Sequence, residues 1–418
     1  MERRPRLLFI SPQFLFPADA GGKIRSTGIL RGMKGGLFDI TLASAAQGDE
    51  AQRFAAPLAE ICDRYVAWPA TRAGRLRRVA AMLSSEPLSA ALDRSRVGQE
   101  AIARLLAEDF DVVVADFVHA AVLLDRLPRA SVMFTHNVEA EIFARHALHA
   151  RHGLTRAIWR SQYRKMTAFE GRHLPAFGKV IAVSERDLAF FVENYGVRGG
   201  ETIPTGVDLE YFGAGEPVRS DVPALGGEIV FTGSMDWPAN IDAMQYFRAA
   251  IWPLIAAARP AARLTVVGRN PPARLIEASH GLNWRFTGLV DDIRPFVRAA
   301  DAYIVPLRVG GGTRIKIYEA MAMRRPVVST AIGVEGLPLE PGRHYRLAET
   351  PEAFAQEILG LLADPGQGGA MAEEAYDFIL KRFSTRRVAR IFEEICCRAM
   401  GNRSRQPAPN AAALALAG

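Results

Sequence analysis

Short apolar segments alternate with amphipathic ones along the first half of the chain. Compact apolar runs are typical of strands buried on both faces, whereas apolar residues that recur every three or four positions are typical of helices. This pattern predicts strands at residues 7–11, 40–43, 112–116, 131–135 and 180–184, and helices from near residue 24 and over residues 101–108. Strands that alternate with helices predict a parallel, doubly wound α/β sheet.

The alternation stops near residue 200 and then starts again. Residues 201–228 are rich in Pro, Gly and charged residues, which is typical of a connection between domains. The second series has predicted strands at 229–233, 263–267, 284–287, 302–306 and 327–329, and predicted helices at 241–257, 293–299, 314–323 and 370–381. In open sheets of this kind, ligands bind at the carboxyl ends of the strands.

The length of 418 residues exceeds the size at which one hydrophobic core keeps growing, so we expect two α/β domains. The first covers residues 1–203 and the second covers residues 204–383. A helix at about 384–399, with Ser384 as its N-cap, is expected to pack back on the first domain. Residues 402–418 are expected to form a flexible tail.

The composition of the chain indicates where in the cell the protein is located. The apolar runs fall well short of the roughly 18 residues that a membrane-spanning helix requires, and the basic start of the chain lacks the apolar core of a signal peptide. Cys62, Cys396 and Cys397 form neither a metal-binding pattern nor a disulfide framework, so they are expected to be reduced packing residues. The sequence therefore predicts a cytoplasmic protein.

The net charge of +7 comes from the first half of the chain, because residues 1–200 hold 28 Lys and Arg against 21 Asp and Glu, while residues 201–418 hold 24 of each. Two arginine clusters contribute to this excess: Arg72, Arg75, Arg77 and Arg78, and then Arg156, Arg160 and Arg164 on one helical face. A basic face suits the anionic headgroups of a cytoplasmic leaflet, where each Lys or Arg contributes about 1 kcal/mol. An ordinary solvated face is the alternative, and no nucleic-acid partner is expected because no recognition module accompanies the charge.

The segment 300–330 has the most informative chemistry. It reads as a buried strand, a glycine-rich loop at Gly310, Gly311 and Gly312, and a helix that opens with Thr313. Free amides of the loop and the positive end of the helix dipole form a phosphate site. Arg314 and Lys316 add fixed positive charge there, and Glu319 can accept hydrogen bonds from ribose hydroxyls. A plain strand–helix–strand crossover with surface cations is the alternative.

This segment, "GGGTRIKIYEAMA", resembles the donor-binding signature of the family-4 (group 1) retaining glycosyltransferases, in which two glutamates lie eight positions apart. Glu319 matches the second glutamate, whereas Gly311 stands where the first is expected. The variant resembles a branch associated with exopolysaccharide biosynthesis, in which backbone amides replace the missing carboxylate. The resemblance extends over nearly the whole chain and implies the GT-B fold, two Rossmann-like domains that face an interdomain cleft.

The resemblance also assigns roles in the first domain. "SPQFLFPADAGGKIRS" resembles the first glycine-rich loop of the family, so Gly21 and Gly22 are expected to bring amides toward the donor, with Arg25 as a further cation. "FTHNVEAE" resembles the segment that carries the family's active-site histidine. His136 is therefore expected to approach the transferred sugar, with Asn137 and Glu139 on the acceptor side.

In the second domain, "IVFTGSMDWPANIDAM" resembles the first strand and loop of the donor domain and places Gly233 and Ser234 at the nucleotide. Many relatives have an Arg and a Lys in that loop, and this chain has Ser234 and Asp236 instead, so Arg314 and Lys316 are expected to hold the diphosphate. "LTVVGRNPP" and "FTGLVDDI" resemble the stretches that line the base, around Gly268 and Val290.

The resemblance implies a retaining, metal-independent transfer without a cofactor, from a UDP- or GDP-linked sugar to a lipid-linked or oligosaccharide acceptor in cell-surface polysaccharide biosynthesis. Two alternatives stay open. A GT-B sugar-nucleotide epimerase would use carboxylates such as Glu139 or Asp116 as acid and base. A catalytically silent GT-B binding protein is the other alternative, because the first family glutamate is missing.

Overall fold

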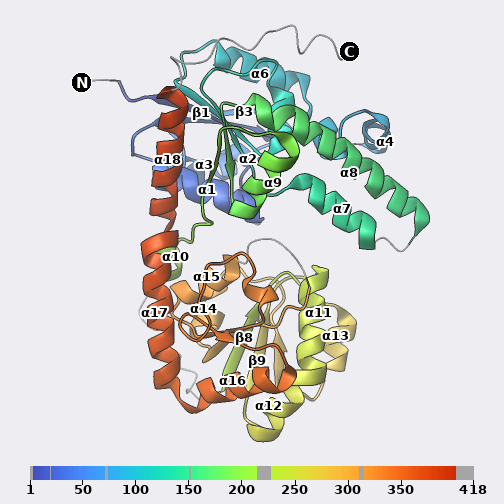
Figure 1. The fold of residues 1–418 in the computed structure, drawn as a ribbon, viewed down its shortest axis with the longest axis vertical. Helices are drawn as coiled ribbons and strands as arrows, with labels where there is room; N and C mark the ends of the chain where they lie inside the picture. The colour runs from blue at the N-terminus through green and yellow to red at the C-terminus, as the bar shows by residue number, and fades with distance from the viewer. Residues whose placement is uncertain are drawn as a thin grey trace. The chain divides into compact units, whose positions relative to one another are not determined.

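The computed structural model of the protein describes residues 3–18, 20–70, 74–149, 152–213, 227–309 and 315–401 (Figure 1). The chain divides into two compact units, Met1–Pro204 with Arg386–Gly418, and Thr205–Thr385. Each unit is built on a sheet whose strand pairs are all parallel. The prediction of two parallel α/β domains is confirmed.

The sheet of the first unit has seven strands in the order β3-β2-β1-β4-β5-β6-β7. Their bounds are β1 Arg6–Ser11, β2 Asp39–Ala46, β3 Arg64–Pro69, β4 Val112–Asp116, β5 Ser131–Phe134, β6 Lys179–Ala182 and β7 Gly200–Thr202. All residues of β4 and β5 are buried, which explains their continuous apolar sequence. The strand order reverses between β1 and β4, and ligands of doubly wound sheets bind at such a reversal.

Twelve helical segments are described in the first unit. They are α1 Gly21–Met33, α2 Glu50–Arg53, α3 Ala55–Ala59, α4 Arg75–Leu83, α5 Leu88–Asp93, α6 Arg96–Leu106, η1 Val118–Leu123, α7 Glu139–His149, α8 Gly153–His173, η2 Leu174–Ala176, α9 Glu185–Tyr195 and α18 Thr385–Gly401. Helix α9 has a capping residue at each end. The Ser184 side chain accepts a hydrogen bond from the Asp187 amide at its start, and Gly196 ends the helix with φ of 70°.

Helix α18 contributes to the hydrophobic core of the first unit, although it follows the whole of the second unit in sequence. Val388, Phe392, Ile395 and Ala399 form its buried stripe. The ring of Phe392 meets Phe134 of β5 edge-on, with the centroids 5.2 Å apart. The last helix therefore completes the fold of the first unit.

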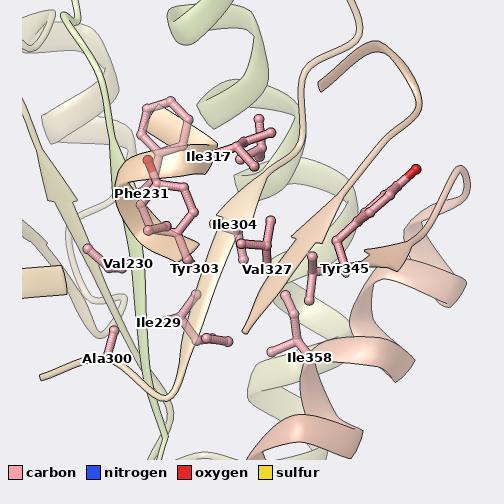
Figure 2. Close-up of a cluster of buried hydrophobic side chains, with 14 of the residues drawn as sticks. Ile229, Val230, Phe231, Ala300, Tyr303, Ile304, Ile317, Val327, Tyr345 and Ile358 are labelled. Atoms are coloured by element: carbon pink, nitrogen blue, oxygen red, sulfur yellow. The ribbon is translucent and has the colours of Figure 1, made fainter. Parts of the chain in front are cut away.

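The sheet of the second unit has six strands in the order β10-β9-β8-β11-β12-β13. Their bounds are β8 Glu228–Thr232, β9 Arg263–Val267, β10 Trp284–Phe286, β11 Ala302–Val305, β12 Val327–Ser329 and β13 Arg346–Leu347. Figure 2 shows side chains from this sheet, including Ile229, Ile304 and Val327, within one apolar cluster that also includes Ile317 and Ile358 from helices. The strand order reverses between β8 and β11.

Ten helical segments are described in the second unit. They are α10 Leu209–Gly213, α11 Pro238–Tyr246, the π-helical turn η3 Phe247–Ile251, α12 Trp252–Ala258, α13 Ala273–Ala278, α14 Arg294–Arg298, α15 Ile315–Ala322, η4 Ile332–Val334, α16 Pro351–Ala363 and α17 Pro365–Phe383. Thr350 caps the start of α16 and Asp364 caps the start of α17, because the side-chain oxygen of each accepts a hydrogen bond from a backbone amide of the first turn.

The apolar pattern did not predict three strands, β3, β7 and β13. Each forms an edge of its sheet, and each is at least partly exposed, so its sequence lacks a continuous apolar run.

Candidate functional site

His136 lies just beyond β5, next to the strand reversal of the first unit, and its side chain is 1% exposed. Its Nε2 lies 2.7 Å from Asp116 Oδ1 at the end of β4. The Ser26 hydroxyl donates to the same oxygen at 2.9 Å, and the Ser11 hydroxyl donates to Asp116 Oδ2 at 3.1 Å. On the other side of the ring, Arg25 Nη1 lies 3.0 Å from His136 Nδ1.

These hydrogen-bond partners determine which nitrogen of the His136 imidazole carries the proton. A guanidinium can only donate and a carboxylate can only accept, so Nδ1 is the acceptor and Nε2 carries the proton. Burial lowers the pKa of His136, and the opposing attraction of Asp116 does not restore it. Burial also lowers the pKa of Arg25, to about 10, which leaves it charged at neutral pH. The site therefore presents a neutral histidine held between a buried carboxylate and a cation.

The sequence predicted a glycine-rich loop followed by a helix from near residue 24, whereas helix α1 begins at Gly21, so Gly21 and Gly22 lie in its first turn. Gly22 has no room for a side chain, because a Cβ there would lie 2.5 Å from the ring of Phe117. Phe117 has φ of 65° and its ring lies 4.2 Å from that of His136. The first turn of α1 can therefore pass close to the histidine.

Asn137 is exposed and Glu139 is half-buried at the first turn of α7. Burial raises the pKa of Glu139, and the charge of His119 and a hydrogen bond from Asn137 oppose the shift. His119 was not predicted as a site residue. Its Nδ1 lies 2.6 Å from Asp93, which makes it a second histidine–carboxylate pair beside the predicted acceptor-side residues.

In the second unit, Lys316 lies in the first turn of α15. Its Nζ donates to the backbone oxygen of Thr232 at 3.0 Å and lies 3.4 Å from Asn240 Oδ1. It also lies 4.2 Å from the ring centre of Phe231. The ammonium is therefore fixed at the carboxyl end of β8.

Glu319 is one turn further along α15 and is half-buried. Burial raises its pKa to about 7, and the charge of Lys316 lowers it in part. Both predicted residues therefore lie together on α15. Gly310, Gly311, Gly312, Thr313 and Arg314 lie outside the described residues.

Gly233 and Gly268 bring the ends of β8 and β9 into contact. A Cβ on Gly268 would lie 1.9 Å from the backbone oxygen of Gly233, and a Cβ on Gly233 would lie 2.7 Å from the Asn240 amide. Val290 is half-buried near Gly288, whose backbone pairs with Gly268. The two glycines therefore allow the backbone after β8 to pack directly against the backbone after β9, while the nucleotide-binding role predicted for Gly233, Gly268 and Val290 stays a prediction.

Arg269 also reaches this edge, and sequence reasoning did not identify it. Its Nε donates to the Ser234 hydroxyl at 2.8 Å and lies 3.4 Å from Asp236. The contact joins residues 35 positions apart. Since it depends on the adjacency of β8 and β9, a cation search confined to one loop could not find it.

The two arginine clusters fall on helices α4 and α8. Arg77 donates to the backbone oxygens of Leu92 and Arg94, so it holds α4 on α5. The other described arginines of the two clusters are exposed: Arg75, Arg78, Arg156, Arg160 and Arg164. Arg72 lies outside the described residues. Near the α7–α8 turn, Leu148 and Leu154 are 75% and 76% exposed.

Within the described part of the chain, no group of three or more His, Cys, Asp or Glu side chains is arranged to hold a metal ion. None of the helices described is both long and apolar enough to cross a bilayer.

Solved structures resemble this protein over nearly its whole length. Sucrose-phosphate synthase from Thermosynechococcus elongatus superposes with a TM-score of 0.70 at 16% identity, over 96% of this chain and 100% of that one. Anabaena HepE in complex with UDP-glucose superposes with a TM-score of 0.65 at 17% identity, over 94% and 99% of the two chains. The two parallel-sheet units and these neighbours define a GT-B fold.

The family assignment comes from sequence comparisons. Residues 44–211 match the model described as Glycosyltransferase Family 4, and residues 226–364 match Glycosyl transferases group 1. The chain therefore belongs to the family-4, group 1 glycosyltransferases.

Two relatives give further context. A phosphatidyl-myo-inositol mannosyltransferase of Mycobacterium leprae is 28% identical over 265 residues, which are 59% of this chain and 70% of the relative. An uncharacterized 44.6 kDa protein in the cps region of Klebsiella pneumoniae is 23% identical over 175 residues, which are 40% of this chain and less than half, 45%, of that protein.

Proposed function

We propose that this protein is a retaining glycosyltransferase that moves a sugar from a nucleotide diphosphate to a lipid-linked or saccharide acceptor. The observation that carries this proposal is the placement of Lys316 and Glu319 together on α15, at the carboxyl end of β8. A cation can neutralise a diphosphate there, and the carboxylate can accept hydrogen bonds from ribose hydroxyls. The names of the relatives, a mannosyltransferase and a cps-region protein, support transfer in cell-surface polysaccharide or glycolipid biosynthesis.

The chemical step that we propose depends on leaving-group stabilisation. As the bond between the anomeric carbon and the diphosphate oxygen breaks, negative charge grows on the diphosphate, and Lys316 stabilises it without a metal ion. The acceptor oxygen attacks the same face of the sugar, and its proton passes to the departing phosphate oxygen. Retention of anomeric configuration follows from this same-face attack.

We assign His136 the positioning of the transferred sugar. Both nitrogens of its ring are already bonded, so a sugar hydroxyl can reach Nδ1 only when Arg25 moves away from it. Asp116 would hold the ring in place during that exchange. Because both oxygens of Asp116 accept hydrogen bonds and the residue is fully buried, it is badly placed to exchange protons with a sugar as an epimerase requires.

The acceptor side is proposed to work at a membrane surface, through the exposed arginines of α4 and α8. The exposed Leu148 and Leu154 near the α7–α8 turn support this, because apolar residues beside cations favour an anionic bilayer interface.

The activity is tested with purified protein, radiolabelled UDP-glucose, UDP-galactose and GDP-mannose, and polyprenyl-diphosphate-linked sugars as acceptors, in the presence of EDTA. We expect labelled lipid product whose new linkage has the anomeric configuration of the donor. Epimerised nucleotide sugar without transfer would support the epimerase, and unchanged donor with every acceptor would support a binding protein.

Donor binding tests the site directly. Glu319→Ala removes the ribose acceptor, so calorimetry with UDP and GDP is expected to show loss of the binding seen with the wild type. Glu373→Ala is the control, because Glu373 pairs with Arg324 beyond the far end of α15. Unchanged affinity of Glu319→Ala would contradict the placement of the donor.

A further inference from the structure

The loop after β8 contains Ser234 and Asp236 and has no Lys or Arg between Gly233 and Trp237. The structure brings a cation into this loop from the neighbouring strand. Arg269 follows β9, contacts both Ser234 and Asp236, and keeps a side chain that is 47% exposed. Its charge therefore lies at the loop although it comes from another part of the sequence.

Arg269 and Lys316 are joined by a short chain of polar contacts. Lys316 Nζ lies 3.4 Å from Asn240 Oδ1, and the Asn240 amide donates to the backbone oxygen of Ser234 at 2.8 Å. The Ser234 hydroxyl then accepts from Arg269. Asn240 lies in the first turn of α11 and is only 8% exposed. The contacts that join the two cations therefore pass through a buried side chain. The two cations therefore border the same carboxyl end of β8.

The orientation of Arg269 suits an incoming anion. Its hydrogen bond to Ser234 uses Nε and its side chain is 47% exposed, so the guanidinium can meet a partner from solvent while it keeps this contact. Two parallel N–H groups match two phosphate oxygens, and such charge-assisted pairs are stronger than neutral hydrogen bonds. Asp236 is 45% exposed, so its hold on Arg269 is a surface ion pair that a diphosphate can outcompete.

We infer that Arg269 is the second cation that binds the donor diphosphate, and that it supplies from the end of β9 the positive charge that the loop after β8 lacks. Asp236 and Ser234 hold the guanidinium in place until the nucleotide arrives. The inference rests on the proposed function, because it assigns a further residue to the same donor site.

The test is calorimetry with UDP and GDP on Arg269→Gln, together with NMR titration of the nucleoside of whichever nucleotide binds. We expect the affinity for the diphosphate to fall about 10- to 100-fold, as for loss of a charge-assisted bond, and nucleoside binding to change less than about threefold. Arg269→Lys should lose less than Arg269→Gln, since it keeps the charge. Arg324→Gln is the matched control, an ion-paired arginine beyond the opposite end of α15.

Asp236→Asn gives a second, opposite readout. Release of Arg269 from its ion pair is expected to raise diphosphate affinity, and this gain should vanish in the Arg269→Gln background. Wild-type diphosphate affinity in Arg269→Gln, or an equal loss of nucleoside binding, would overturn the inference and leave the proposed function standing. Failure of the wild type to bind either nucleotide would overturn both.

Discussion

At the scale of single residues, the chemistry of this protein depends on pairs that fix charge and protonation. Asp116 and Arg25 together select the neutral, Nε2-protonated form of His136. Lys316 lowers, without cancelling, the rise in pKa that burial causes in Glu319.

The buried Asp116 gives a stability prediction. Asp116→Ala leaves His136, Ser11 and Ser26 without their buried acceptor, so we expect the free energy of unfolding of the first unit to fall by about 2–4 kcal/mol. Urea denaturation measures this change. Asp109→Ala, which removes only an exposed ion pair to Arg3, should change stability by less than about 1 kcal/mol. Equal effects of the two substitutions would contradict the proposed network.

Glu319 gives a pH prediction. Its pKa in the folded protein, about 7, lies above its ordinary value of 4.5, so the folded state binds more protons between these values. Its contribution to stability is therefore fully present below about pH 4.5 and is lost as pH rises to about 7. Thermal unfolding should show Glu319→Gln gaining stability relative to the wild type from pH 5 to pH 8. A constant difference over that range would show that the carboxyl has an ordinary pKa.

At the scale of elements, the position of α18 shows how a helix remote in sequence completes a core. Phe392 is fully buried against Phe134, so Phe392→Ala is expected to destabilise the first unit by about 3–5 kcal/mol. Hydrogen exchange of β5 amides would report the loss locally. Arg390→Ala, on the exposed face of α18, should stay within about 0.5 kcal/mol of the wild type.

The helices and strands differ in how well their positions could be predicted from the sequence. Central strands such as β4 were predicted because burial on both faces requires an unbroken apolar run. The start of α1 at Gly21 was missed because glycine is a poor helix former, and the Phe117 ring that excludes a side chain at the next residue, Gly22, is remote in sequence. Arg269 was missed for a similar reason, since its place depends on the pairing of β8 with β9. The placement of Lys316 close to Glu319 could be predicted because one short helix, α15, carries both residues.

At the scale of the whole molecule, the uneven distribution of charge supports membrane binding by the first unit. We expect vesicles containing phosphatidylglycerol to sediment the wild type, and Arg160→Glu with Arg164→Glu to weaken this binding strongly. Higher salt should weaken wild-type binding as well. Arg96→Glu with Arg104→Glu is the control, because these exposed arginines of α6 change the net charge equally. Identical binding of the two double variants would remove α8 as the contact.

The central claim is that a nucleotide diphosphate binds at the carboxyl end of β8, beside α15. A crystal structure of the protein with UDP or GDP tests it most directly. We predict phosphate oxygens about 3 Å from Lys316 Nζ and from the Arg269 guanidinium, with a ribose hydroxyl at Glu319. A nucleotide bound elsewhere, or side chains that fill the start of α15, would contradict the account.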